Sequence, residues 1–434
     1  MVELWILGIG VLAVYAIFGA LMALRKIDVL LALPIMAFLM YLVASLDPVA
    51  TIDIVLVKGT FSQASTIILI IVSAAVAELM VKTGMVQTLV RGAVELAGGR
   101  PTVAAFCAMA AVAYCHMGAW PFGTTVATGI VVLPILTALG IPAYMAMALF
   151  LFGISFGIAM SPVYYRIVVE SITKVPYSQS FVPIAAIVGI PYLAAVVLWW
   201  VWRARKEGVS LRSAGVRQPT TSEPIVKAPI YSLITPVIPV LLILYAGWDP
   251  TASFWAALLY GAVTTLPTVK SVSKQLDNVL RSFYDGLSSS GFQIILFLGI
   301  GMIGLSAGGK AVTDAVRPLL QPVMPTSIIT FALFFAVLLP LIYFRGPLSP
   351  LGVGAGLYFL IASLLKQWIV PLSAIMWIYW IPLSWLCPTV SRVVWAAGFL
   401  KEPPIPHLKR LVLIAWGVGA VVIMIAVPYL ASLK

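Results

Sequence analysis

The sequence predicts an all-α polytopic membrane protein, and its composition is the first reason. The chain has 434 residues, of which 62% are hydrophobic and only 9% are charged. Ordinary soluble domains carry about 25% charged residues, so a water-soluble domain is excluded. Since one crossing takes about 20 apolar residues, the chain has room for roughly ten or eleven spans and little else. We therefore expect a multi-pass protein of the cell membrane.

A second reason is the succession of apolar stretches with almost no charge. Two longer stretches, at about 101–139 and 326–365, carry Gly and Pro near their centres. Because Pro removes a backbone donor and Gly weakens a helix, both are expected to break and form re-entrant hairpins. The remaining stretches predict ten spans, at about 4–24, 29–46, 64–81, 143–160, 180–202, 229–248, 251–269, 287–307, 367–386 and 411–431.

The basic residues predict the orientation. The formal net charge is +12, but Lys and Arg are spread over short connections, so no nucleic-acid partner is expected. The most basic connection, residues 203–227, contains six Lys and Arg together with Pro, Ser and Thr. Because cytoplasmic loops carry the excess of Lys and Arg, we place this linker in the cytoplasm and both termini on the opposite side.

The third reason is an internal repeat. At an offset of 226 residues, three pairs of identical residues align: Pro121 with Pro347, Pro162 with Pro388 and Arg166 with Arg392. An odd number of predicted crossings separates the two copies, so they are expected to be inverted in the membrane. Chance matching among Pro-containing apolar helices is the alternative. Inverted repeats with discontinuous helices are typical of secondary transporters.

The repeat divides the chain into three parts, namely a first membrane repeat (1–204), a cytoplasmic linker (205–227) and a second, inverted repeat (228–434). In each repeat an amphipathic segment, a hairpin and a broken helix follow one another. The amphipathic segments, expected at the membrane interface, are 84–98 and 308–322; the hairpins are about 101–139 and 326–365; the broken helices are about 143–173 and 367–400.

Three arginines lie beside the predicted helix breaks instead of at span ends: Arg166, Arg345 and Arg392. An arginine at bilayer depth costs about 2.5–3.5 kcal/mol on insertion scales, so it normally has a partner or lines a wet cavity. An anionic substrate is one such partner. The alternative is a structural ion pair, for which Glu170, four residues after Arg166, is a candidate.

The hairpin tips, 118–125 and 346–352, are expected to face each other near the bilayer midplane, with the breaks at 159–163 and 385–389 beside the same cavity. Glycine permits close approach of a ligand, and a restarting helix directs free N–H groups at an anion. Hydroxyl groups could donate to that anion, or simply cap the helices. The candidate binding residues in the tips are Gly123, Thr124, Thr125, Gly346 and Ser349.

His116 and Thr128 are candidates for ion coupling. His116 lies near the first tip, where titration near neutral pH could move a proton; a packed neutral histidine is the alternative. Thr128 follows the tip by one turn. No acidic residue lies in either tip, and no metal site is expected. The chain has no nucleotide-binding motif, which disfavours ATP-driven pumping within it.

At the two tips and the Ser161-Pro162 and Cys387-Pro388 breaks, the arrangement resembles the ion-transporter superfamily, whose re-entrant hairpins and broken helices form the substrate site. Arg345 through Pro350 is similar to the signatures of the citrate–metal symporter family and its gluconate and dicarboxylate relatives. The Ser-Asn-Thr tips of the sodium–dicarboxylate branch are absent.

The resemblance implies a cation-coupled secondary transporter of a small organic anion, a carboxylate, that works by alternating access. Na+ or H+ would be the coupling ion, no cofactor is expected, and a homodimer is compatible with the resemblance. A sodium/proton antiporter of the same fold is the alternative, although the predicted core is poor in the carboxylates that antiport requires. A channel or a membrane enzyme is the third class, and no catalytic cluster supports an enzyme.

Overall fold

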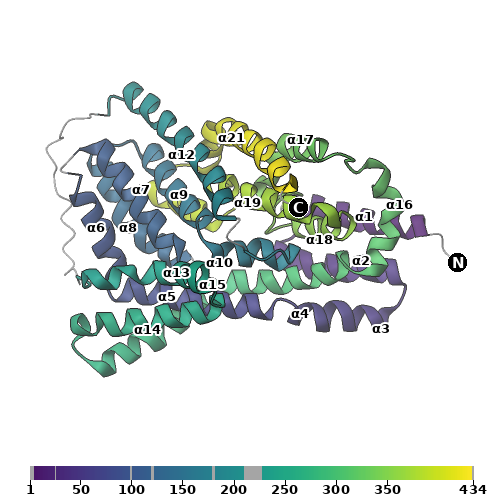
Figure 1. Ribbon diagram of the computed structural model, residues 1–434, viewed down its shortest axis with the longest axis horizontal. Helices are drawn as coiled ribbons and strands as arrows, with labels where there is room; N and C mark the ends of the chain where they lie inside the picture. Colours follow the sequence, from purple (N-terminus) through teal and green to yellow (C-terminus); the bar gives the residue numbers. More distant parts are fainter. Residues whose placement is uncertain are drawn as a thin grey trace.

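The computed structural model describes residues 4–24, 26–97, 100–118, 122–177, 181–209 and 227–432, and within these ranges every regular element is a helix (Figure 1). Eight helices are long and apolar enough to cross a membrane, or nine if the bent pair Ala143–Ala159 and Pro162–Thr173 counts as one span. The all-α polytopic class is thereby confirmed. Most of the predicted linker, 210–226, lies outside the described residues.

The first half begins with a helical hairpin and ends with a long helix. Its elements are α1 (Leu4–Ala23), α2 (Val29–Ser45), α3 (Pro48–Thr51), the π-helical η1 (Ile52–Lys58), α4 (Gly59–Phe61), α5 (Ala64–Lys82), α6 (Met85–Glu95), α7 (Pro101–Met117), α8 (Phe122–Ala138), α9 (Ala143–Ala159), α10 (Pro162–Tyr165), the π-helical η2 (Arg166–Glu170), α11 (Ser171–Thr173) and α12 (Phe181–Lys206).

The second half is also entirely helical in its described residues. Its elements are the 3₁₀ helix η3 (Ile230–Val237), α13 (Ile238–Ala246), α14 (Pro250–Val269), α15 (Val272–Ala307), α16 (Lys310–Leu320), η4 (Gln321–Val323), α17 (Ile328–Leu338), η5 (Leu339–Arg345), α18 (Gly354–Leu364), η6 (Lys366–Trp368), α19 (Ile369–Leu386), α20 (Ser391–Leu400) and α21 (Pro404–Ser432).

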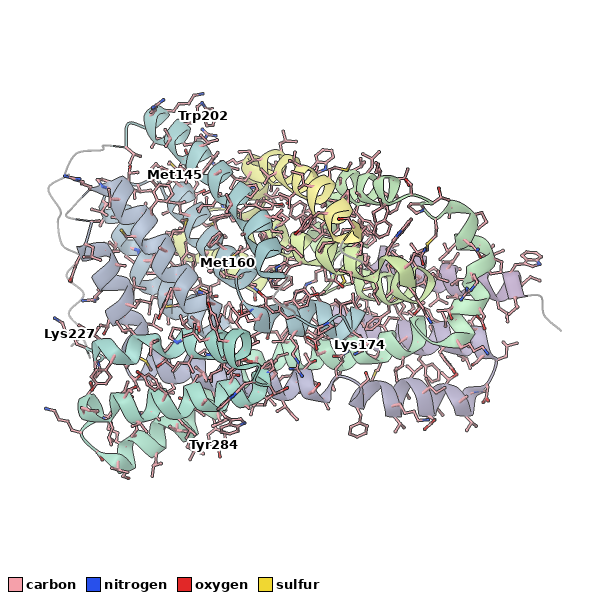
Figure 2. The ribbon with its side chains drawn as sticks, in the orientation of Figure 1. Met145, Met160, Lys174, Trp202, Lys227 and Tyr284 are labelled. Atoms are coloured by element: carbon pink, nitrogen blue, oxygen red, sulfur yellow. The ribbon has the colours of Figure 1, made fainter. Side chains whose placement is uncertain are left out.

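Both predicted amphipathic segments form short helices, α6 and α16, which lie at opposite ends of the longest axis of the molecule (Figure 1). The N-terminal helix α1 lies at one end, and Lys227, which follows the linker, lies at the other (Figures 1 and 2). This arrangement is the one that inverted repeats would produce. The inversion relative to a bilayer, and the cytoplasmic side of the linker, stay predictions.

The antiparallel helices α5 and α15 pack closely at small residues. A Cβ on Gly286 would lie 3.0 Å from the backbone of Ala74 in α5, and one on Gly301 would lie 2.3 Å from the carbonyl oxygen of Gly59 in α4, which precedes α5. Small residues allow two helix backbones to approach in this way. Lys82 and Asp285 join the same two helices through an ion pair. These helices therefore form a firm support for the elements around them.

The two predicted hairpins are interrupted helices, as expected. The second passes from α17 into η5, and residues 346–353 are not helical before α18 begins. In the first, α7 ends at Met117, Gly118 is not helical, residues 119–121 lie outside the described residues, and α8 begins at Phe122.

The first tip is shorter than predicted. Gly123, Thr124 and Thr125 belong to the first turn of α8, so the extension of the non-helical tip to residue 125 is wrong. The interruption near Gly118 has a packing reason. A Cβ at this position would lie 1.6 Å from the carbonyl oxygen of Pro236, so the backbone of the hairpin meets the backbone of η3 where only glycine fits.

Both helices that the sequence predicts to be broken contain a non-helical interruption, and the first is also bent. Helix α9 ends at Ala159 and α10 begins at Pro162, with a bend of 76° between them. Helix α19 ends at Leu386, and α20 begins at Ser391 after four non-helical residues. The first break is therefore shorter than the second, which affects where the following arginines lie.

Candidate functional site

Two adjoining cavities lie between the interrupted elements of both halves. They share three lining residues, Gln293 of α15 and Ser391 and Arg392 of α20. The first cavity is completed by His116, Phe122, Thr125 and Tyr164. The second is completed by Phe292, Leu296, Arg345, Ser349, Leu351, Trp380, Leu383, Ser384 and Val390. Residues of both hairpins and of both broken helices thus line these two cavities. That the cavities form a binding site stays a prediction.

Arg345 is held at the tip of the second hairpin by an unusual backbone. Phe344 and Arg345 both have φ of 57°, in the left-handed region that side chains with a Cβ seldom adopt. Nη1 of Arg345 donates to the carbonyl oxygen of Leu351 at 3.1 Å, and the guanidinium lies 4.9 Å from the centre of the Phe292 ring. These contacts fix the direction of the guanidinium and leave its other N–H groups available for a ligand.

Arg392 brings a second positive charge to the same place. It begins α20 beside the break, is partly buried, and lies 6.0 Å from the ring centre of Trp380. In the described part of the chain no carboxylate comes within 4.0 Å of either Arg345 or Arg392. Two arginines without acidic partners in a partly dehydrated cavity favour an anionic ligand.

Three buried polar atoms on residues of the second cavity have no hydrogen-bond partner among the described residues: Oε1 of Gln293, Nε1 of Trp380 and Oγ of Ser384. Buried polar atoms are normally paired, so unpaired ones at a cavity indicate groups that a ligand or water completes. Sequence reasoning missed all three. For Trp380 and Ser384, proximity to the second break was the one available signal, and Gln293 had none.

His116 connects the two arms of the first hairpin. Its Nδ1 donates to the carbonyl oxygen of Val112 at 2.8 Å, and its Nε2 lies 3.4 Å from Oγ1 of Thr125. Since a carbonyl can only accept, Nδ1 carries the proton, and Nε2 is the acceptor of the neutral ring. The histidine and Thr125 both line the first cavity, so they can reach a ligand there.

The other predicted tip residues support the site without all lining it. Thr128 donates to the carbonyl oxygen of Thr124 at 2.7 Å, so its hydroxyl is used within α8. Oγ1 of Thr124 is buried and has no partner among the described residues. Ser349 lines the second cavity, whereas Gly346 forms the compact turn before it and does not.

Gly123 packs against an acidic residue that the sequence gave no reason to select. A Cβ on Gly123 would lie 2.0 Å from Oε1 of Glu78, which belongs to α5. Glu78 also accepts a hydrogen bond from the hydroxyl of Ser289 on α15 at 3.3 Å. Glycine at position 123 therefore lets the start of α8 rest directly on the α5 and α15 pair.

Arg166 does not reach the cavities. Its Nη1 lies 2.9 Å from Oδ2 of Asp249 and its Nε lies 3.9 Å from Glu170, the structural partner considered from the sequence. The reason is the length of the first break. Helix α10 starts at Pro162, so Arg166 lies a full turn beyond the break, whereas α20 starts at Ser391 and places Arg392 directly at its break.

The family of the chain follows from a match over most of its length. Residues 14–351 match the sequence model of the tripartite ATP-independent periplasmic transporter, DctM component. The chain belongs to the DctM family. DctM proteins are secondary transporters of the inner membrane, so the predicted class and location are confirmed. The resemblance to the citrate–metal symporter and gluconate branch is not confirmed by this family assignment.

Among solved structures, this DctM chain is similar to Neisseria gonorrhoeae MtrF, whose structure is described as illuminating a class of antimetabolite efflux pumps. The sequences are 13% identical, the TM-score is 0.53, and the similarity covers 88% of this chain and 85% of the other. At this identity the similarity concerns the fold alone. No curated protein matches the chain.

Proposed function

We propose that this chain is the transporting membrane component of a tripartite system and moves a small carboxylate by alternating access, with Na+ or H+ as the coupling ion. The observation that carries the proposal is the pair of cavities between the hairpins, where Arg345 and Arg392 lie without acidic partners among the described residues. The unpaired polar atoms of Trp380 and Ser384 supply further donors for carboxylate oxygens.

The sodium/proton antiporter alternative gains no support from the site. Antiport requires acidic side chains that bind both cations, but no Asp or Glu of the described residues lines either cavity. The charge of the site is positive and therefore suits an anion.

The family name indicates the partners. The DctM protein is one component of a three-part transporter, and we propose that this chain works with a periplasmic substrate-binding protein and a small membrane subunit, as DctM transporters do. The binding protein would deliver the anion to this chain. This arrangement does not require a homodimer.

For the coupling ion, His116 and Thr128 stay the candidates, and we add Thr124. Nε2 of the neutral His116 can accept a proton near the first cavity, whereas the unpaired Oγ1 of Thr124 could contribute to a cation site at the start of α8. Binding measured with sodium present or absent, and at two pH values, would separate the two couplings.

The test is substrate binding by purified protein, measured as thermal stabilisation over a panel of mono-, di- and tricarboxylates and then by calorimetry. Arg345→Lys keeps the charge but loses the planar fork of N–H groups. Losing a charged hydrogen bond of about 1.5–3 kcal/mol weakens binding about tenfold to more than a hundredfold. Arg392→Lys should behave similarly.

Arg281→Lys is the matched control, because Arg281 is exposed on α15 and pairs with Asp277. It should leave the affinity unchanged. Well-folded Arg345→Lys and Arg392→Lys proteins with wild-type affinity for every carboxylate that binds would overturn the assignment of the site. Binding of no carboxylate by the assembled system would overturn the substrate class.

A further inference from the structure

Arg166 and Asp249 join two elements that are far apart in the sequence. Arg166 belongs to the second part of the broken helix in the first half, whose ends are marked by Met160 and Lys174 in Figure 2. Asp249 precedes α14, where Oδ1 accepts from the backbone N–H of Thr251 at 2.8 Å and Oδ2 meets Arg166 at 2.9 Å. One carboxylate thus caps a helix and holds the broken helix of the other half.

The first half contains a counterpart of this aspartate. Asp28 precedes α2, and its Oδ1 accepts from the backbone N–H of Leu30 at 2.9 Å, which is the same capping contact at the start of the second helix of a hairpin. In the alignment of the two halves, the counterpart of Arg166 is Arg392. The counterpart of the observed ion pair is therefore Arg392 with Asp28.

Arg392 and Asp28 do not form an ion pair in this structure. Among the described residues, no basic group lies within 4.0 Å of Asp28, and no carboxylate lies within 4.0 Å of Arg392. A cavity of about 380 Å³ lies between the two elements. Its lining includes Lys26, Ile27 and Asp28 of the α1–α2 turn together with Phe344, Arg345 and Thr389. Arg345 is the arginine that lines this cavity in the present state. Thr389 lies three residues before Arg392, which does not itself line it.

The two halves thus differ in the contact between a broken helix and the capping aspartate of the other half. On the α13–α14 side the broken helix contacts the capping aspartate; on the α1–α2 side a cavity separates them. In transporters built from inverted repeats, the two access states arise when the halves exchange conformations. An exchange here would open the Arg166–Asp249 contact and bring the break before α20 onto the α1–α2 turn.

We propose that Asp249 and Asp28 are alternating gate residues. Asp249 binds Arg166 in the state described here, which is open at the α1–α2 turn, and Asp28 binds Arg392 in the opposite state. The inference rests on the proposed alternating-access function. Both contacts are partly exposed, and exposed ion pairs contribute little. They therefore bias the two states by only about two- to fivefold each, which suits a transition that must reverse in every cycle.

The experiment measures the exposure of the α1–α2 cavity directly. A cysteine replaces Ile27, which lines this cavity, in a protein where Cys107 is changed to Ser; Cys115 and Cys387 are buried. The rate of maleimide labelling is measured in the purified, detergent-solubilised chain. Asp249→Asn should slow labelling about two- to fivefold, and Asp28→Asn should accelerate it or leave the chain fully in the open state.

Asp53→Asn is the matched control, because it removes an exposed ion pair with Lys58 inside one helix and should not change the rate. Equal labelling in all variants, or a change in the same direction for Asp249→Asn and Asp28→Asn, would overturn the gate. Labelling needs no substrate. Opposite shifts in a protein that binds no carboxylate would therefore uphold the gate and reject the proposed substrate, whereas normal binding with unchanged labelling would reject the gate alone.

Discussion

Replacing Gly123 with Ala tests whether the start of α8 rests on Glu78. The added Cβ would lie 2.0 Å from Oε1 of Glu78, and real Cβ atoms essentially never come closer than 3.0 Å to another atom. The first turn of α8 must therefore move by about 1 Å, or the carboxylate must leave Ser289. Oε1 is the far end of a flexible side chain, so the carboxylate yields more easily than the helix. Losing its hydrogen bond from Ser289 costs about 1.5 kcal/mol, against which alanine returns about 0.5–1 kcal/mol of helix propensity.

The displacement should also weaken substrate binding, because Thr125 follows Gly123 by two residues and is already 3.4 Å from Nε2 of His116. A shift of about 1 Å in a binding group is enough to reduce function strongly. We expect a lower melting temperature for Gly123→Ala in detergent and a lower carboxylate affinity in calorimetry.

Two further variants make this test decisive. Gly417 of α21 has no atom within 4 Å of an added Cβ, so Gly417→Ala should be neutral or slightly stabilising. Glu78→Ser should restore stability in the Gly123→Ala protein, because it removes the atoms in conflict. If Gly123→Ala proves as stable as Gly417→Ala, or Glu78→Ser fails to rescue it, the close contact is not the constraint we describe.

Two other predictions concern contacts between the halves. Trp385→Phe removes a buried 2.9 Å hydrogen bond from Nε1 to the carbonyl oxygen of Ala148 and should destabilise the protein by about 1–3 kcal/mol in thermal unfolding. The control is Trp202→Phe at the exposed end of α12, which should cost less. Equal losses of stability in the two variants would contradict the prediction. Burial raises the pKa of Asp249, but the N–H of Thr251 and the charge of Arg166 outweigh it, so the pKa lies below its ordinary 3.8. A lowered pKa means that the contribution of Asp249 is present above the ordinary value and is lost as the pH falls through the lowered one. The ratio of the wild-type and Asp249→Asn labelling rates, in which the common effect of pH on the thiolate cancels, should thus be the same at about pH 5.5 and about pH 7.5. A ratio that approaches one at the lower pH would refute this.

The sequence predicted the interrupted elements well because the signals are local. Glycine and proline within apolar runs have the same effect on a helix wherever it packs. The interruptions of both hairpins and both broken helices were found in this way, whereas the two amphipathic helices were found from the charged residues within them. The helical stretch from Pro48 to Phe61 was missed, because Asp53, Lys58 and Gly59 make it look like a loop.

The site was harder to predict because its membership depends on where helices restart. Arg166 and Arg392 align in the sequence, yet a break that is two residues longer directs only Arg392 into the cavity. Gln293, Trp380 and Ser384 look like ordinary residues of long helices. They matter because each has a buried polar atom without a hydrogen-bond partner among the described residues. For Gln293 the surrounding residues include His116 and Thr125, which are more than a hundred residues away in the sequence. No local pattern reveals such surroundings.

The composition of the first cavity has a consequence for biosynthesis. His116 and Thr125 are made in the first half of the chain, but they line a cavity with Gln293, Ser391 and Arg392, which are made in the second half. Interrupted helices with polar side chains are not tolerated against lipid. The first hairpin therefore cannot complete its burial before α15 and α20 have been synthesised. Until they are inserted it is covered only by its neighbours α6 and α9, so the first cavity forms late in the assembly of the protein.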